Sequence, residues 1–229
     1  MKQIALDIGL APEPGFETFV AGRNASAVQH LRLWCAGAGA RSPVPVYLWG
    51  ESGAGKTHLL RAARQAIGQQ GGLAGWLSPQ TDPTLPFSAG WDVVVFDDVQ
   101  DYDAEHQHTA FNWFVNAVTP AEGAPRGVLA AGTLPPADLP LREDLRTRLG
   151  WGHVFELAAP SEAERRAILR RAADARGVFL SDEVMDFVLA RFARDLGSLM
   201  ALLEQIDRYA LRAKRAITIP LIKEMLADS

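Results

Sequence analysis

This 229-residue sequence has a single cysteine, and long apolar runs and an excess of positive charge are missing from it. Cys35 is the only cysteine, which excludes a disulfide framework within the chain and a cysteine-based zinc site. No stretch approaches the ~20 uninterrupted apolar residues that span a bilayer, and the first residues lack the apolar run of a signal peptide. These absences favour a protein of the reducing cytoplasm with no membrane contact.

The missing basic excess also argues against a nucleic-acid partner. The formal net charge is −4. Residues 1–160 contain 11 basic and 16 acidic side chains, and residues 161–229 contain 12 and 11. Because a dedicated DNA-binding domain concentrates Lys and Arg, direct sequence-specific DNA binding is not expected. Hydrophobic residues at 48% and charged residues at 22% are typical of a globular chain.

Apolar strands and amphipathic helices alternate in the first two thirds of the chain. The run 93–96 is continuously apolar, as expected for a strand that is buried on both faces. Residues 78–90 contain three prolines and predict a loop. This alternation predicts an α/β fold, a parallel five-stranded sheet with flanking helices. The expected strands are 46–49, 75–77, 93–96, 128–131 and 154–157, and the expected helices are 56–70 and 103–118.

Strands disappear after Pro160. Ser161 and Glu164 form the pattern of a capping box, and Gly177 is a typical helix end. The pattern therefore predicts a C-terminal all-α subdomain. We divide the chain into a flexible tail, an α/β nucleotide-binding core and a helical subdomain, at 1–15, 16–159 and 160–229. The further expected helices are 182–193, 197–214 and 220–227.

A phosphate-binding motif lies between the first expected strand and helix. Residues 50–57 match G-x-x-x-x-G-K-[ST] throughout. Its glycines let backbone N–H groups converge on phosphate oxygens at a helix N-terminus. Lys56 is expected to reach the β- and γ-phosphates and Thr57 to ligate Mg²⁺, and the expected ligand is ATP or ADP. The expected nucleotide contacts are Gly50, Glu51, Ser52, Gly53, Ala54, Gly55, Lys56, Thr57 and the following His58, for whose imidazole a structural role is favoured.

Two acids follow the buried strand at 93–96. Asp97 is the expected second Mg²⁺ residue, acting through water, and Asp98 is the expected catalytic base or water-orienting residue. Alone, this pattern fits a strand that simply turns at two acids. Beside the phosphate loop it indicates a nucleotide site.

These motifs together resemble the AAA+ ATPases of the DnaA initiator clade, over residues 16–227. The matching segments are Phe16–Asn24, Asp97–Gln100, Leu145–Gly152 and Ala216–Pro220. The resemblance implies that Val20 and Gly22 lie against adenine. It also implies a helical lid at 160–229, and it makes Arg148 an arginine finger that acts on a neighbour's γ-phosphate.

The roles of several other residues in these motifs remain open between a functional and a structural interpretation. Thr133 ends a strand where a sensor would contact the γ-phosphate, although a strand-ending turn explains it equally well. Arg142 and Arg146 match the finger less well than Arg148 and are interpreted as interface or solvated side chains. Gly197 stands where the family has its second sensor arginine, and Arg194 is one turn away. We therefore expect this chain's own ATP hydrolysis to be weak.

Within that clade the chain is most similar to the Hda family of DnaA regulatory inactivators. No counterpart of the initiator's DNA-binding or helicase-interaction domain is expected, and a Pro-rich loop replaces two initiator helices. The resemblance implies DnaA as partner, with self-association as a possibility. It also implies a replisome-associated location and binding to the DNA polymerase III sliding clamp through Gln3, Leu6 and Ile8, which fit a short clamp-binding motif.

Three functions remain open from the sequence. The first is a regulator of replication initiation that promotes hydrolysis of DnaA-bound ATP. The second is an autonomous ATPase of the helicase-loader kind that acts on single-stranded DNA. The third is a small-molecule kinase with a phosphate loop, which the C-terminal helices fit poorly.

Overall fold

The computed structural model describes residues 14–37, 42–192 and 196–228. Gln3, Leu6, Ile8 and Arg194, to which the sequence assigned roles, lie outside the described residues. The chain divides into two compact units at Pro160. Each unit is described by itself below.

A five-stranded parallel sheet forms the centre of the first unit, as predicted. The strand order is β2-β3-β4-β1-β5. β1 pairs with β4 on one side and β5 on the other, in parallel register. Because β3 and β4 are completely buried, they read as continuous apolar runs. The strands are β1 (Val46–Trp49), β2 (Ala74–Leu77), β3 (Val93–Phe96), β4 (Gly127–Gly132) and β5 (His153–Glu156).

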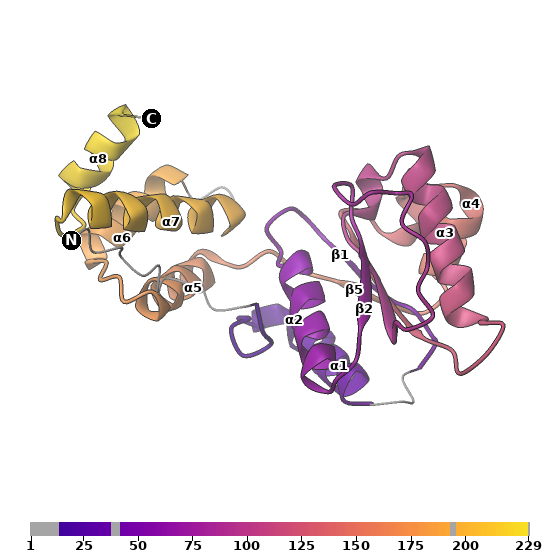
Figure 1. Cartoon of the computed structure of the whole chain (residues 1–229). Helices are drawn as coiled ribbons and strands as arrows, with labels where there is room; N and C mark the ends of the chain where they lie inside the picture. The colour runs from indigo at the N-terminus through magenta and orange to yellow at the C-terminus, as the bar shows by residue number, and fades with distance from the viewer. Residues whose placement is uncertain (1–13, 38–41, 193–195, 229) are drawn as a thin grey trace, which may run out of the picture. The chain divides into compact units, whose positions relative to one another are not determined.

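Helices cover both faces of this sheet (Figure 1). α1 (Ala25–Ala36) and α2 (Lys56–Gln69) enclose one apolar cluster on one face. α3 (Ala104–Val118) and α4 (Glu143–Leu149) enclose a second cluster on the other. The sequence pattern predicted neither α1 nor α4. The buried residues of α1 are apolar and recur at helical spacing, so the sequence contains a signal for this helix. α4 has only seven residues, of which Leu145 and Leu149 are buried.

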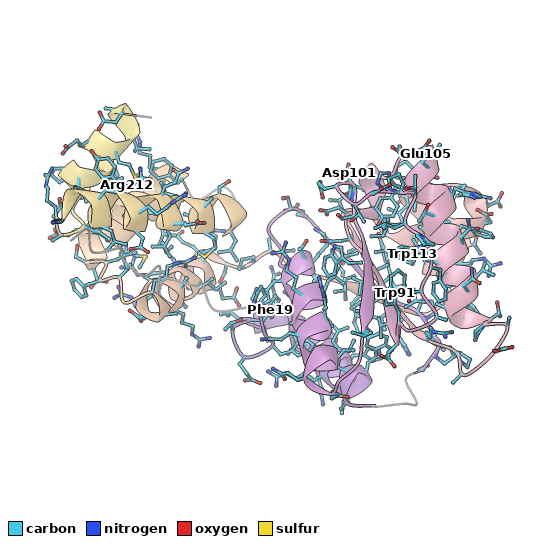
Figure 2. The ribbon with its side chains drawn as sticks, in the orientation of Figure 1. Phe19, Trp91, Asp101, Glu105, Trp113 and Arg212 are labelled. Atoms are coloured by element: carbon cyan, nitrogen blue, oxygen red, sulfur yellow. The ribbon has the colours of Figure 1, made fainter. Side chains whose placement is uncertain are left out.

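The Pro-rich segment 78–90 contains no helix or strand, as predicted, but it is firmly anchored. Three side chains on one stripe of α3 donate hydrogen bonds to alternate carbonyl oxygens of residues 81–85. Figure 2 shows one of these side chains, Trp113, beside Trp91, and their ring centroids are 4.5 Å apart. The pairs are His106 to Thr81, Thr109 to Pro83 and Trp113 to Leu85.

The second unit is all-helical and has its own apolar cluster. The capping box at Ser161 is present, with both reciprocal hydrogen bonds to Glu164, and Gly177 follows the first helix with a positive φ of 68°. No helix in the described ranges is long and apolar enough to cross a membrane. The helices are α5 (Glu162–Ala175), α6 (Asp182–Phe192), α7 (Leu196–Ala213) and α8 (Ile219–Ala227).

Candidate functional site

The phosphate loop joins β1 to α2 with a backbone that requires glycine. Gly50, Gly53 and Gly55 have φ values of 149°, 80° and 91°, in the left-handed region that side chains disfavour. A Cβ on Gly50 would collide with the carbonyl oxygen of Leu157, and one on Gly55 would lie 2.6 Å from Phe19 Cε2. The loop is therefore shaped by close backbone packing.

Lys56 is the first residue of α2 and its side chain is buried. Its Nζ donates to the carbonyl oxygens of Gly50 at 2.8 Å and Glu51 at 2.9 Å. Burial lowers the pKa of Lys56, and the nearby Asp98 and Asp97 oppose that shift. A buried ammonium whose hydrogen-bond partners among the described residues are loop carbonyls is suited to bind an anion, because carbonyl dipoles do not neutralise its charge.

Thr57 and Asp97 meet at the carboxyl end of β3. Thr57 Oγ1 donates to Asp97 Oδ1 at 3.1 Å. Asp97 is 4% exposed, and burial together with Asp98 raises its pKa to about 6, against the lowering effect of the Thr57 hydrogen bond. A hydroxyl and a carboxylate are the hard oxygen ligands that Mg²⁺ uses, with water and phosphate completing its shell. The described residues hold no cluster of three or more metal-ligating side chains.

Asp98 has a strained backbone. It adopts φ 50° and ψ 47°, which is rare for a residue other than glycine. Gln100, for which the sequence predicted no role, links this turn to the end of β4. Its Nε2 lies 3.5 Å from Asp98 Oδ1, and its Oε1 accepts from Thr133 N at 3.0 Å. Thr133 is half-buried directly after β4. The acidic turn and the expected sensor position are thus connected through one side chain.

The segment before α1 folds against the phosphate loop. The imidazole of His58 hydrogen-bonds to Gly15 O at 3.0 Å and lies 3.2 Å from Thr18 Oγ1. The ring centroids of His58 and Phe19 are 5.5 Å apart, and the two rings are tilted relative to each other. Figure 2 labels Phe19 beside α2. Burial lowers the pKa of His58. The His58 side chain therefore holds residues 15–19 against α2, and its contact with a nucleotide stays a prediction.

The expected adenine contacts lie in the same segment. Val20 is half-buried, and Gly22 is exposed with φ 45°. Asn24 fixes the segment to the core, because its side chain donates to Ala158 O at 3.0 Å and accepts from Ala158 N at 2.9 Å. Val20 and Gly22 therefore lie on a segment that contacts both the helix after the phosphate loop and the chain after β5.

Arg148 lies on α4, which packs on the sheet face opposite α2. Its guanidinium carbon is 5.3 Å from the ring centroid of Phe111 and 5.8 Å from that of Phe114. The side chain borders an open hollow beside Trp151, which is 63% exposed. The residues that line the hollow are Arg142, Glu143, Asp144, Thr147, Arg148 and Trp151.

Gly197 is the second residue of α7 and is exposed. It belongs to the helical unit. It has no side chain that could contact a phosphate.

Comparisons with known proteins agree with this architecture. The model of the bacterial DnaA ATPase domain matches residues 10–72, and that of the Hda lid domain matches residues 162–226. An uncharacterized protein of Haemophilus influenzae is 31% identical over 232 residues, covering 98% of each chain. Domain III of the Thermotoga maritima initiator DnaA superposes with a TM-score of 0.77 at 21% identity, covering 96% of this chain and 98% of that one.

Two other solved structures share the fold. A DnaA bound to AMPPCP and single-stranded DNA has a TM-score of 0.66 at 19% identity, covering 91% of this chain and 70% of that one. The Thermotoga maritima Holliday-junction motor RuvB has the same TM-score and identity, covering 95% and 72%. The phosphate loop, the acidic strand end and the sheet order define an AAA+ protein. Within that class the chain belongs to the DnaA-like proteins and resembles Hda.

Proposed function

We propose that this protein is a nucleotide-bound regulator of replication initiation that promotes hydrolysis of ATP held by DnaA. The protein binds its own ATP or ADP together with Mg²⁺. Lys56 binds the phosphates, and Thr57 and Asp97 bind the metal ion. Arg148 extends to the γ-phosphate of the nucleotide on DnaA and stabilises the charge that develops there. Arginine fingers of this kind are worth on the order of 10³–10⁵ in rate.

The position of Arg148 is the observation that carries this proposal. The residue borders an open hollow on the face opposite α2, beside the exposed Trp151. A cation in that position is suited to a nucleotide on a neighbouring molecule. Gly197 supports the proposal that this chain promotes hydrolysis on DnaA more than on its own nucleotide. A chain without the second sensor arginine is expected to bind its nucleotide and to hydrolyse it slowly.

The proposal extends to the sliding clamp. Gln3, Leu6 and Ile8 fit the spacing of a short clamp-binding motif, in which two apolar side chains enter a pocket and the amide bonds at its rim. Tethering to the clamp would raise the local concentration of the regulator beside newly replicated DNA.

The test is the rate of ATP hydrolysis by purified DnaA with clamp-loaded DNA, measured with and without this protein. We expect stimulation that Arg148→Ala abolishes and that Gln3→Ala reduces. The matched control is Arg142→Ala, which removes a neighbouring arginine of the same hollow and should retain most of the stimulation. Full stimulation by Arg148→Ala would contradict the mechanism.

A second function, an autonomous ATPase on single-stranded DNA, is favoured by one observation. Asp98 and Gln100 connect the acidic turn with Thr133, as a complete hydrolysis site would need. ATP turnover by the purified chain that rises with single-stranded DNA, and falls with Asp98→Asn, would support this alternative.

A further inference from the structure

Two arginines share one aromatic ring beside the hollow. Phe111 projects from α3, and the guanidinium carbons of Arg142 and Arg148 lie 4.9 Å and 5.3 Å from its ring centroid. Arg148 is also 5.8 Å from the ring of Phe114, which is completely buried. The two cations are therefore held by the same α3 surface.

The two arginines differ in their polar partners. Arg142 is paired with its neighbour Asp144: Nε lies 2.7 Å from Oδ1, and a terminal nitrogen donates to Oδ2 at 2.7 Å. Within the described ranges, no carboxylate lies within ion-pair distance of Arg148. Two donors of Arg142 are engaged by a carboxylate, whereas the Arg148 guanidinium, within the part of the chain that the structure describes, contacts aromatic rings.

This difference matters because a guanidinium has two kinds of surface. Its planar face stacks on an aromatic ring, while its five N–H donors point outward in the plane. A stacked arginine can therefore hydrogen-bond to a phosphate without leaving the ring, whereas a carboxylate partner occupies two of the five donors and offsets the positive charge. Stacking also restricts a long side chain that otherwise loses much rotamer freedom on binding.

We propose that Phe111 is the positioning residue of Arg148, holding the guanidinium over its ring so that the donors face a phosphate on a partner molecule. This inference rests on the finger role proposed above. It assigns Phe111 an effect on the rate of the stimulated reaction, with no part in the affinity for the partner. Both arginines contact the ring of Phe111, and the pairing of Arg142 with Asp144 makes Arg148 the more available cation of the hollow.

The experiment compares variants in the DnaA hydrolysis assay over a range of regulator concentrations. Phe111→Leu removes the ring, Phe111→Tyr retains it, and Val115→Ala removes volume one turn further along the same helix. We expect Phe111→Leu to lower the maximal stimulated rate about 2–5-fold, in line with a partly exposed cation–π contact. The half-saturating concentration should stay unchanged, and both control variants should keep the wild-type rate.

Three results would overturn the inference. Phe111→Leu could match the wild type, it could change only the half-saturating concentration, or Val115→Ala could lower the rate equally. The second result would make Phe111 a contact to the partner, and the third would make the effect one of general packing. Thermal unfolding and nucleotide binding of each variant serve as controls for folding.

A spectroscopic readout separates this inference from the proposed function. The Arg148 Nε–H resonance, assigned by its loss in Arg148→Lys, should shift in Phe111→Leu as the ring current disappears and stay in place in Val115→Ala. If the wild type fails to stimulate DnaA, the proposed function is wrong, and this shift still decides whether Phe111 holds Arg148. An unmoved resonance overturns the inference.

Discussion

Asp97 and Asp98 are adjacent and chemically identical, yet their surroundings give them different properties. Asp97 points into the protein toward Thr57, and burial raises its pKa to about 6. Asp98 takes a left-handed backbone conformation and lies near Gln100. A buried carboxylate without its cation is costly, so the free protein retains a destabilising group that ligand binding can relieve.

The pKa of Asp97 predicts a dependence of stability on pH. The folded-state value of about 6 exceeds the unfolded value of 3.8. The folded protein therefore binds more protons between these values, and the free energy of unfolding contributed by this group falls as pH rises from about 4 to about 6. In nucleotide- and Mg²⁺-free protein, Asp97→Asn should flatten that slope and raise the free energy of unfolding at pH 7.5 by up to about 3 kcal/mol.

Denaturant unfolding between pH 4 and 8 measures this effect. Asp138→Asn, at an exposed carboxylate, is the matched control and should leave the slope unchanged. Asp97→Asn should also weaken Mg²⁺-dependent nucleotide binding while stabilising the free protein. A variant that loses both stability and binding would contradict the assignment.

At the scale of elements, the loop 78–90 shows how a segment without secondary structure is fixed in place. His106, Thr109 and Trp113 recur at helical spacing on α3, and they donate to carbonyl oxygens that alternate along the loop. The helix stripe thus replaces the hydrogen bonds that a neighbouring strand would provide. Buried carbonyl groups without such donors would be destabilising.

Removing one of these hydrogen bonds should loosen the loop without damaging the sheet. Thr109→Val keeps the shape of the side chain and removes the hydroxyl that donates to Pro83 O. We expect a loss of about 1–3 kcal/mol, because the carbonyl is left without its donor, and faster proteolytic cleavage within residues 78–90. Thr109→Ser retains the hydroxyl and should show clearly slower cleavage than Thr109→Val. Equal cleavage in both variants would show that the hydrogen bond does not restrain the loop.

At the scale of the whole molecule, the sheet unit and the helical unit each have their own apolar core. The sheet unit has one cluster on each face, and α5–α8 enclose a third cluster that lies entirely within residues 169–226. Since burial is the main source of folding free energy, the two units should unfold with separate stabilities.

A core substitution in the helical unit tests this independence. Leu203→Ala removes a side chain that is almost completely buried in α7 and should destabilise the helical unit by about 2–5 kcal/mol. Leu211→Ala lies on the same helix at a position that is 70% exposed, and it should change stability by less than about 0.5 kcal/mol. Segment-resolved hydrogen exchange should show faster exchange in α5–α8 and unchanged protection in β3. Faster exchange in β3 as well would contradict two independent cores.

Local sequence determined the elements whose signals are contained in a few residues. The glycines of the phosphate loop, the apolar run of β3 and the capping box at Ser161 each specify a conformation through sterics or hydrogen bonding at short range. The five strands and the parallel fold followed from these signals. α1 was missed although its buried positions were readable, and α4 was missed because seven residues carry too little periodicity.

Only the tertiary structure decided which distant side chains meet. His58 lies in the phosphate-loop helix, yet it contacts Gly15 and Thr18, some 40 residues away. Gln100 reaches the chain after β4, and Phe111 lies under an arginine 37 residues further along. Such contacts depend on the sheet bringing separate elements together, and no local pattern in the sequence encodes them. The sequence by itself therefore determined the AAA+ fold and predicted a nucleotide site of that kind, and the fold decided which residues lie around the predicted site.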